Sequence, residues 1–217
     1  MLNTEATGQY AGMARPGYFF IGQDGVIREK FFEAKYRDRL SGNNVIEKLF
    51  PELAADVTTT VNAPHLQLVT QQSDATAFPG GRITLTAQVR LPSDVHVYAP
   101  GTKGYIPIKL SIDPQTELRL EPPVYPRSKV LYLAAIKERV PVFEGAFHIR
   151  QDIEVTSAAG FSSGLGADGR TVTITGKLDY QACDRTTCYL PTSIPLQWRL
   201  QVLPLDRQRA PEPIRHK

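Results

Sequence analysis

The chain has 217 residues, of which 41% are hydrophobic and 22% charged, a composition typical of a folded protein. Its 25 lysines and arginines nearly balance 22 aspartates and glutamates, which argues against a nucleic-acid binder that depends on a basic surface. No stretch approaches the roughly 18 consecutive apolar residues of a membrane-spanning helix. We therefore expect any membrane link to run through another protein.

The first 55 residues predict a β-hairpin followed by one helix. Two apolar runs, at 18–21 and 26–32, flank Gln-Asp-Gly, and Gly25 accepts the positive φ that a tight turn needs. Residues 41–53 carry apolar side chains at helical spacing, with Ser41 or Asn43 available as the N-cap. These apolar positions are Val45, Ile46, Leu49, Phe50 and Leu53. A hairpin and one helix are too small to form a stable core alone, so we expect the end of a larger domain.

Small and β-branched residues at 56–63 lack an amphipathic period and predict a linker. From residue 64 the pattern changes to strict alternation of apolar and polar residues, first at 82–91. The same alternation returns at 106–112, 143–155, 172–180 and 194–202. Five such strands, separated by turn-rich loops, predict an antiparallel β-sandwich over 64–205, with residues 206–217 as a tail.

The two cysteines, Cys183 and Cys188, lie close together between the last two predicted strands. A disulfide between them closes a short loop and stabilises the fold by only roughly 2 kcal/mol, so it is a weak structural staple. This placement fits reversible redox chemistry, but a local structural bridge or two unpaired thiols also remain open. Two sulfurs without a second pair leave a tetrahedral metal ion half-coordinated, which argues against a metal site.

A resemblance to a known family rests on these cysteines and their neighbours. The matching residues are Tyr-Gln-Ala-Cys-Asp at 180–184, Cys-Tyr-Leu-Pro at 188–191 and the strand at 194–196, with a weaker match at 91–100. With these motifs, residues 60–205 resemble the N-terminal periplasmic domain of the thiol:disulfide interchange protein DsbD. The resemblance implies an immunoglobulin-like antiparallel β-sandwich whose last hairpin carries a cysteine pair.

The resemblance also implies a function and a set of site residues. Cys183 and Cys188 become the catalytic pair of a thiol:disulfide oxidoreductase that passes electrons between a thioredoxin-like donor and oxidised client proteins. No cofactor, metal or nucleic acid is implied. Residues 131–140 take the place of the family's cap loop, which shields the pair until a partner docks. The flanking or shielding residues are Tyr98, Leu131, Tyr132, Tyr180, Asp184, Tyr189 and Pro191.

A second resemblance covers residues 1–55, which are similar to the C-terminal end of an AhpC/TSA peroxiredoxin-like domain. In that class, a strand, an Asp-Gly turn and a strand, like residues 19–27, precede the last helix. The resemblance implies a small α/β fragment of a thioredoxin-like fold. Because no cysteine precedes Cys183, we expect no peroxidase chemistry. We expect instead a truncated product of a longer protein in which a redoxin domain is fused to the sandwich.

Two questions stay open at this point. The alternative function is a non-catalytic interaction domain in which the cysteine pair is a permanent bridge and the redoxin part a remnant. Resemblance implies a periplasmic or otherwise extracytoplasmic location, whereas residues 1–20 contain no secretory signal and predict a cytoplasmic protein if Met1 is the true start. The four histidines show no ligand spacing, and we expect no catalytic role for them.

Overall fold

The computed structural model describes residues 7, 11–15, 17–32, 39–50, 58–133 and 137–205, and this part of the chain is mainly β. The predicted tail at 206–217 and positions 56–57 of the predicted linker lie outside the described residues. Within them, no helix combines the length and the apolar character that crossing a membrane requires.

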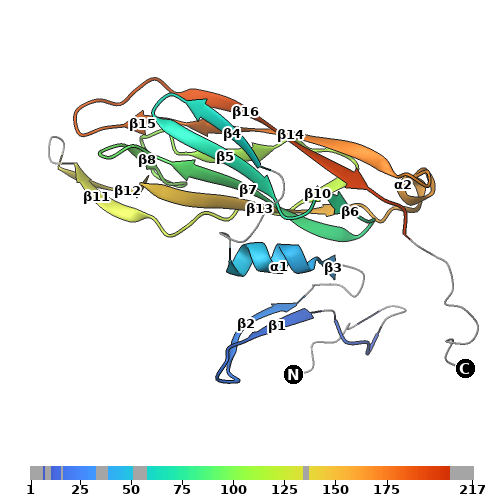
Figure 1. The fold of residues 1–217 in the computed structure, drawn as a ribbon. Helices are drawn as coiled ribbons and strands as arrows, with labels where there is room; N and C mark the ends of the chain where they lie inside the picture. Colours follow the sequence, from blue (N-terminus) through green and yellow to red (C-terminus); the bar gives the residue numbers. More distant parts are fainter. Residues whose placement is uncertain are drawn as a thin grey trace, which may run out of the picture.

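Two sheets pack face to face and share the main core (Figure 1). The first sheet has the order β10 (Leu118–Leu120), β13 (Ala146–Val155), β7 (Gly81–Arg90), β5 (Leu66–Gln72) and β4 (Thr58–Ala63). The second has the order β6 (Thr76–Ala77), β16 (Thr192–Val202), β14 (Arg170–Tyr180) and β9 (Lys109–Ile112). All strand pairs in these two orders are antiparallel except β16 with β6.

The apolar side of most of the alternating strands faces this core, as the sequence predicts. Two boundaries differ: Ile106 is exposed before β9, and the predicted strand at 143–155 divides into the end of β12 and β13. On β7 and β13 the fully buried Leu85 and Ile149 lie in the shared core, and on β16 the buried Trp198 donates from its indole nitrogen to the carbonyl of Gln71 at 3.1 Å. Burial of alternate positions fixes the register, because a slip by one residue exposes the whole apolar row of a strand. The predicted sandwich is therefore confirmed as a set of packed antiparallel sheets.

A third sheet lies at one end of the sandwich, with helix α2 (Ala159–Ser163) at the other end (Figure 1). Its order is β11 (Lys129–Leu133), β12 (Glu138–Glu144), β8 (His96–Tyr98) and β15 (Ala182–Cys183). It carries a small core of its own, built from Tyr98, Val140, Val142 and Cys183. The cysteine pair is thus attached to this end sheet rather than to the main core.

The linker prediction is wrong for residues 58–63. They form β4, an antiparallel partner of β5 with Val61 opposite Leu68. The run of threonines followed by valine is β-branched and suits an extended strand better than a flexible connection. At the edge of a sheet, such a strand needs no amphipathic period, which is why the sequence pattern hid it.

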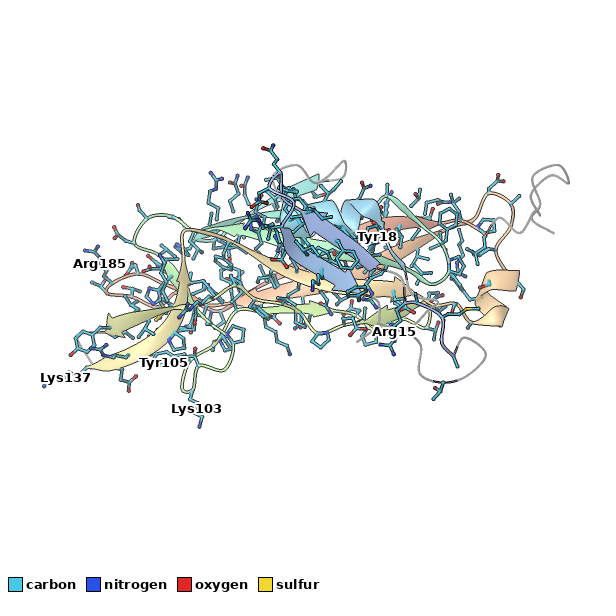
Figure 2. The ribbon with its side chains drawn as sticks, turned by 90° about the horizontal axis from the view of Figure 1, so that it is seen from below. Arg15, Tyr18, Lys103, Tyr105, Lys137 and Arg185 are labelled. Carbon is cyan, nitrogen blue, oxygen red and sulfur yellow. A yellow bond between two sulfur atoms is a disulfide. The ribbon has the colours of Figure 1, made fainter. Side chains whose placement is uncertain are left out.

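The predicted N-terminal hairpin and helix are present. β1 (Gly17–Ile21) and β2 (Ile27–Phe32) pair around a turn in which Gly25 has φ +77°, and α1 (Gly42–Leu49) follows the short β3 (Arg39–Leu40). Ser41 is the N-cap, since its hydroxyl accepts a hydrogen bond from the amide of Asn44. The hydroxyl of Tyr18 donates to the carbonyl of Leu40 at 2.9 Å and so joins the hairpin to the start of the helix (Figure 2).

Helix α1 buries polar rather than apolar side chains, which corrects the sequence expectation. Asn44 and Glu47 are its buried residues, whereas Ile46 is 42% exposed. The helix meets the outer face of the first sheet, where Thr84 and Thr86 stand between core positions. The Asn44 amide donates to the Thr84 hydroxyl at 2.6 Å, and the Thr86 hydroxyl donates to the Glu47 carboxylate. The helix therefore docks through hydrogen bonds, which a hydrophobic period does not reveal.

The Glu47→Gln substitution tests this docking through its pH dependence. Burial raises the pKa of Glu47 above its ordinary value of 4.5, so the ionised carboxylate disfavours the docked state at neutral pH and the protonated form does not. We expect E47Q to unfold at higher denaturant concentration than wild type at pH 7, with the difference shrinking as the pH falls and vanishing below 4.5. Glu29→Gln, at an exposed position on β2, is the control; a difference independent of pH contradicts the interpretation.

Candidate functional site

Cys183 and Cys188 form a disulfide across a tight loop that follows β14. The two residues are an antiparallel bridge pair with their Cα atoms 4.0 Å apart. Backbone hydrogen bonds close the loop on both sides, from the Asp184 amide to the Thr187 carbonyl and from the Tyr189 amide to the Ala182 carbonyl, each at 2.9 Å. The loop is therefore a small hairpin whose two sides are joined by backbone hydrogen bonds and by the disulfide.

The two sulfurs differ sharply in their environment. Cys183 is 1% exposed and belongs to the small core of the end sheet, whereas Cys188 is exposed on the outer side of the loop. Thiol–disulfide exchange needs the attacking thiolate to approach one sulfur in line with the bond that breaks. A partner reaches Cys188 far more readily than Cys183.

Asp184 holds the loop in shape. Its carboxylate accepts from the amides of Thr186 and Thr187 at 2.7 Å and from the hydroxyl of Tyr189 at 2.6 Å. These hydrogen bonds, led by that of Tyr189, keep the pKa of Asp184 well below its usual range. Tyr189 in turn stacks on His65, with ring centroids 3.6 Å apart. Asp184 and Tyr189 thus lie in the loop that carries the two cysteines.

Tyr98 is the side chain that contacts the disulfide. Its hydroxyl oxygen lies 3.6 Å from Sγ of Cys188 and 3.7 Å from Sγ of Cys183. A disulfide sulfur carries no hydrogen, so the hydroxyl is the donor in these contacts. Burial raises the pKa of Tyr98, which keeps this donor protonated at neutral pH.

Tyr98 also connects the sulfurs to the β11–β12 hairpin, which we call the cap hairpin. Its ring stacks on Tyr105 at a centroid distance of 4.2 Å, and the Tyr105 hydroxyl donates to Glu138 of β12 at 2.7 Å. That hydrogen bond to a carboxylate raises the pKa of Tyr105 to about 12. Tyr105 lies at the same end of the molecule as Lys137 and Arg185, which mark the cap hairpin and the cysteine loop (Figure 2).

The cap hairpin covers the buried sulfur from one side. Leu131 and Leu133 pack against the cluster that contains Tyr98 and Cys183, while Tyr132 points away, is 54% exposed and lies under the guanidinium of Arg139. Because side chains alternate along a strand, only every second residue of β11 can face the sulfurs. The structure thus packs Leu131 against the cluster that contains Cys183, whereas Tyr132 lines only the neighbouring cavity.

Two further residues were expected at the site, and one of them, Tyr180, lies elsewhere. Tyr180 belongs to the main core, 1% exposed, and its hydroxyl donates to the carbonyl of Pro64 at 2.7 Å. Its side chain points into the sandwich because it shares a face with Ala182, whereas Cys183 points to the opposite face. Pro191 is exposed just before β16.

Sequence reasoning missed His96, which the structure places beside Cys183. In the register of the end sheet, His96 lies between Glu144 of β12 and Cys183 of β15. It is 4% exposed, and its Nε2 has no hydrogen-bond partner among the residues that the structure describes. The spacing of His96 and Tyr98 in the sequence indicates that both side chains lie on one face of a strand. Only the pairing of β8 with β15 shows that this face carries Cys183.

A cavity of about 590 Å³ opens beside His96, between the cap hairpin and the cysteine loop. Its apolar lining includes Leu91, Val95 and Leu131, and its rim carries Asp94 and Arg185, which form an exposed ion pair at 2.8 Å. Over the described parts of the chain, no group of three or more histidine, cysteine, aspartate or glutamate side chains gathers to hold a metal ion. The chemistry that the site offers is that of its sulfurs.

Comparisons with solved structures give low similarity. The N-terminal periplasmic domain of ScsB from Proteus mirabilis is 15% identical, with a TM-score of 0.42 over 64% of this chain and 49% of that chain. The Neisseria meningitidis DsbD N-terminal domain in the reduced form is 16% identical, with a TM-score of 0.33 over 52% of this chain and 74% of that one. This chain therefore spans about half the length of the ScsB domain. No curated protein sequence matches the chain.

The sequence profile of one family settles the relationship. It is described as the N-terminal region of thiol:disulfide interchange protein DsbD, and it matches residues 63–195, which is more than half of the chain. The match includes the cysteine loop, Tyr98, His96 and the cap hairpin. The chain belongs to the family of DsbD N-terminal domains.

Proposed function

We propose that this chain is a thiol:disulfide interchange module that passes electrons from a thioredoxin-like donor to oxidised client proteins. The observation that carries the proposal is the disulfide between an exposed Cys188 and a buried Cys183, with the Tyr98 hydroxyl against both sulfurs. Membership of the DsbD N-terminal family supports the same chemistry, and with it an extracytoplasmic location.

The difference in exposure between the two sulfurs supports one order of events. A donor thiolate attacks Sγ of Cys188, the bond to Cys183 breaks, and the electron pair leaves on the buried sulfur. The second thiol of the donor then releases the reduced domain. In the client half-reaction, the Cys188 thiolate attacks the client disulfide, and Cys183 resolves the mixed disulfide that forms. Each cycle moves two electrons and restores the Cys183–Cys188 bond.

Two surrounding groups fit this scheme. The Tyr98 hydroxyl is placed to donate to whichever sulfur carries negative charge, and hydrogen bonds to a charged acceptor are stronger than those to a neutral one. The cap hairpin, with Leu131 over the buried sulfur, leaves the exposed sulfur as the point of entry.

We propose in addition that residues 1–55 are related to the C-terminal end of a redoxin domain. The order of hairpin β1–β2, Asp-Gly turn and helix α1 supports this relationship. Because the segment contains no cysteine, its part in this chain is packing: α1 hydrogen-bonds to the outer face of the sandwich, and Lys48 forms an ion pair with Asp152 at 2.7 Å.

Single cysteine substitutions test the order of attack. Cys183→Ser leaves the exposed thiol, which glutathione disulfide first converts into a glutathione adduct on Cys188; the thiolate of a thioredoxin whose resolving cysteine is removed is then expected to displace glutathione and to accumulate as a mixed disulfide. Cys188→Ser leaves the buried thiol and is expected to trap at least about tenfold less, because a partner cannot approach it. Non-reducing electrophoresis after alkylation measures the amount of mixed disulfide that each variant forms. Equal trapping by the two variants contradicts the assignment of Cys188.

The reduction potential of the cysteine pair separates the relay from a permanent bridge. We expect a value between roughly −150 and −280 mV, in the range of exchange proteins, measured by equilibration with glutathione and thioredoxin buffers. A value below about −300 mV supports the alternative of a non-catalytic interaction domain. The double variant Cys183→Ser, Cys188→Ser controls for folding, since a six-residue loop contributes only about 2 kcal/mol to stability.

Tyr98→Phe tests the hydroxyl at the sulfurs. We expect Y98F to slow reduction of the domain by thioredoxin several-fold, because the sulfur that leaves loses its hydrogen-bond donor, while stability changes by about 1 kcal/mol or less. Tyr180→Phe is the matched control: it removes a buried hydroxyl that bonds the Pro64 carbonyl and costs about 1 kcal/mol of stability without changing the exchange rate. Equal effects of the two variants on the rate refute the role of Tyr98.

A further inference from the structure

His96 is a polar side chain in the sulfur site whose ring nitrogen Nε2 the fold leaves without a partner. It lies directly across from Cys183 on the neighbouring strand, and directly opposed residues of an antiparallel pair place their Cβ atoms about 5 Å apart on the same face of the sheet. Its ring also makes an edge contact with Tyr98 at a centroid distance of 5.5 Å, and Tyr98 contacts both sulfurs. The imidazole and the buried sulfur therefore share one side of the end sheet.

The buried sulfur needs a proton acceptor when it acts. In the reduced domain Cys183 is a thiol buried in the small core of the end sheet, and such burial disfavours the thiolate that must attack. Water has little access to a residue that is 1% exposed. A neighbouring base that is neutral at physiological pH lets the thiol lose its proton as the new sulfur–sulfur bond forms.

The other titratable groups around His96 are less suited to this task. On its own strand, Tyr98 is a protonated phenol whose pKa is raised by burial. The carboxylate of Asp184 is occupied by its loop hydrogen bonds and is a weak base, because those bonds lower its pKa. Glu144 is opposite His96 on the side away from Cys183. At the cavity rim are Tyr132 of β11 and the ion-paired Asp94 and Arg185.

His96, by contrast, is poised as a neutral base. Burial lowers the pKa of the imidazole from its usual 6.5, and this effect outweighs the opposite pull of Glu144 and Asp184. At pH 7 the ring is therefore uncharged, with one nitrogen carrying a lone pair. The structure leaves Nε2 without a partner, so this lone pair is available to a proton from the adjacent thiol.

We propose that His96 accepts the proton of the Cys183 thiol while Cys183 attacks a mixed disulfide held on Cys188. In this step the Cys183–Cys188 bond forms, the bond between Cys188 and the client sulfur breaks, and its electron pair leaves on the client sulfur. The proton passes from Sγ of Cys183 to the imidazole and returns to the leaving client thiolate or to water. The inference rests on the proposed function, because it assigns a residue to the resolving step of the same exchange.

The test follows the resolving step alone. The reduced full chain is mixed with glutathione disulfide, samples are quenched in acid, and mass spectrometry counts the glutathione adduct on Cys188 and the intramolecular disulfide. For wild type we expect a rate of adduct resolution that is flat from about pH 6.5 to 8. Without a base the rate rises about tenfold per pH unit in this range, in proportion to the thiolate fraction.

The variant His96→Gln keeps a polar side chain but removes the base. We expect it to resolve the adduct about tenfold or more slowly at pH 7, to lose the flat region, and to approach the wild-type rate at high pH. The matched control is His148→Gln on β13, a half-buried histidine that contacts Gln88 and has a pKa lowered by burial but lies on another sheet. It is expected to keep the wild-type rate and profile. The reduction potential is expected to stay unchanged in both variants, since a base alters the rate and not the equilibrium.

The outcomes separate this inference from the proposed function. If wild type and H96Q resolve the adduct with the same rate and pH profile, His96 is not the proton acceptor, although the exchange function stands. If wild type forms no intramolecular disulfide from the adduct, the exchange function itself fails. Should H96Q not fold, the wild-type profile decides: a rate that climbs tenfold per pH unit between 6.5 and 8 overturns the proposal.

Discussion

The site depends on a two-residue strand pairing. β15 contributes only Ala182 and Cys183 to the end sheet, and their register with β8 sets Cys183 opposite His96 and next to Tyr98. Because side chains alternate, this same register sends Ala182 into the main core and the cysteine into the small one. A shift by one residue would turn the sulfur into the sandwich and leave no redox centre.

The remaining features of the site follow from that pairing. With Cys183 fixed and buried, the short loop has to bring Cys188 to the outside, and the Asp184 hydrogen bonds keep the loop closed around the bond. The cap hairpin extends the sheet that already carries Tyr98, so it covers the inner sulfur as a consequence of sheet order. The difference in solvent exposure between the two sulfurs therefore results from the strand topology rather than from any single side chain.

The sequence predicted those parts of the molecule that depend on local pattern. Strict alternation located the sandwich strands, and Gly25 located the hairpin turn. The cysteine motif located the site through its family. The prediction that depends on contacts between distant segments was wrong. Helix α1 was expected to bury an apolar stripe, but the sheet face that it meets presents threonines. The buried residues of the helix are therefore Asn44 and Glu47. Hydrophobic periodicity describes the helix alone, whereas the way it packs depends also on the sheet that it contacts.

The same limit explains the site residues. Tyr98, Leu131 and Tyr180 were all named through the family resemblance. The structure places the Tyr98 hydroxyl at the sulfurs and Leu131 against the cluster with Cys183, whereas strand alternation turns Tyr180 into the main core. His96 lies inside the weaker family match at 91–100, but its position became informative only once β8 and β15 were seen side by side. A residue that is close to a sulfur in space but distant in sequence can be predicted only when the pairing of the two strands is already known from the family.

The separation of the small end-sheet core from the main core has a thermodynamic consequence. Tyr98, Val140, Val142 and Cys183 form a cluster distinct from the packed interior of the sandwich. A region with its own few apolar contacts can open as a local cooperative unit at a fraction of the free energy of global unfolding. We therefore expect the end sheet to open locally at a lower free-energy cost than the sandwich, so that the surroundings of the cysteine pair can rearrange while the main core stays packed.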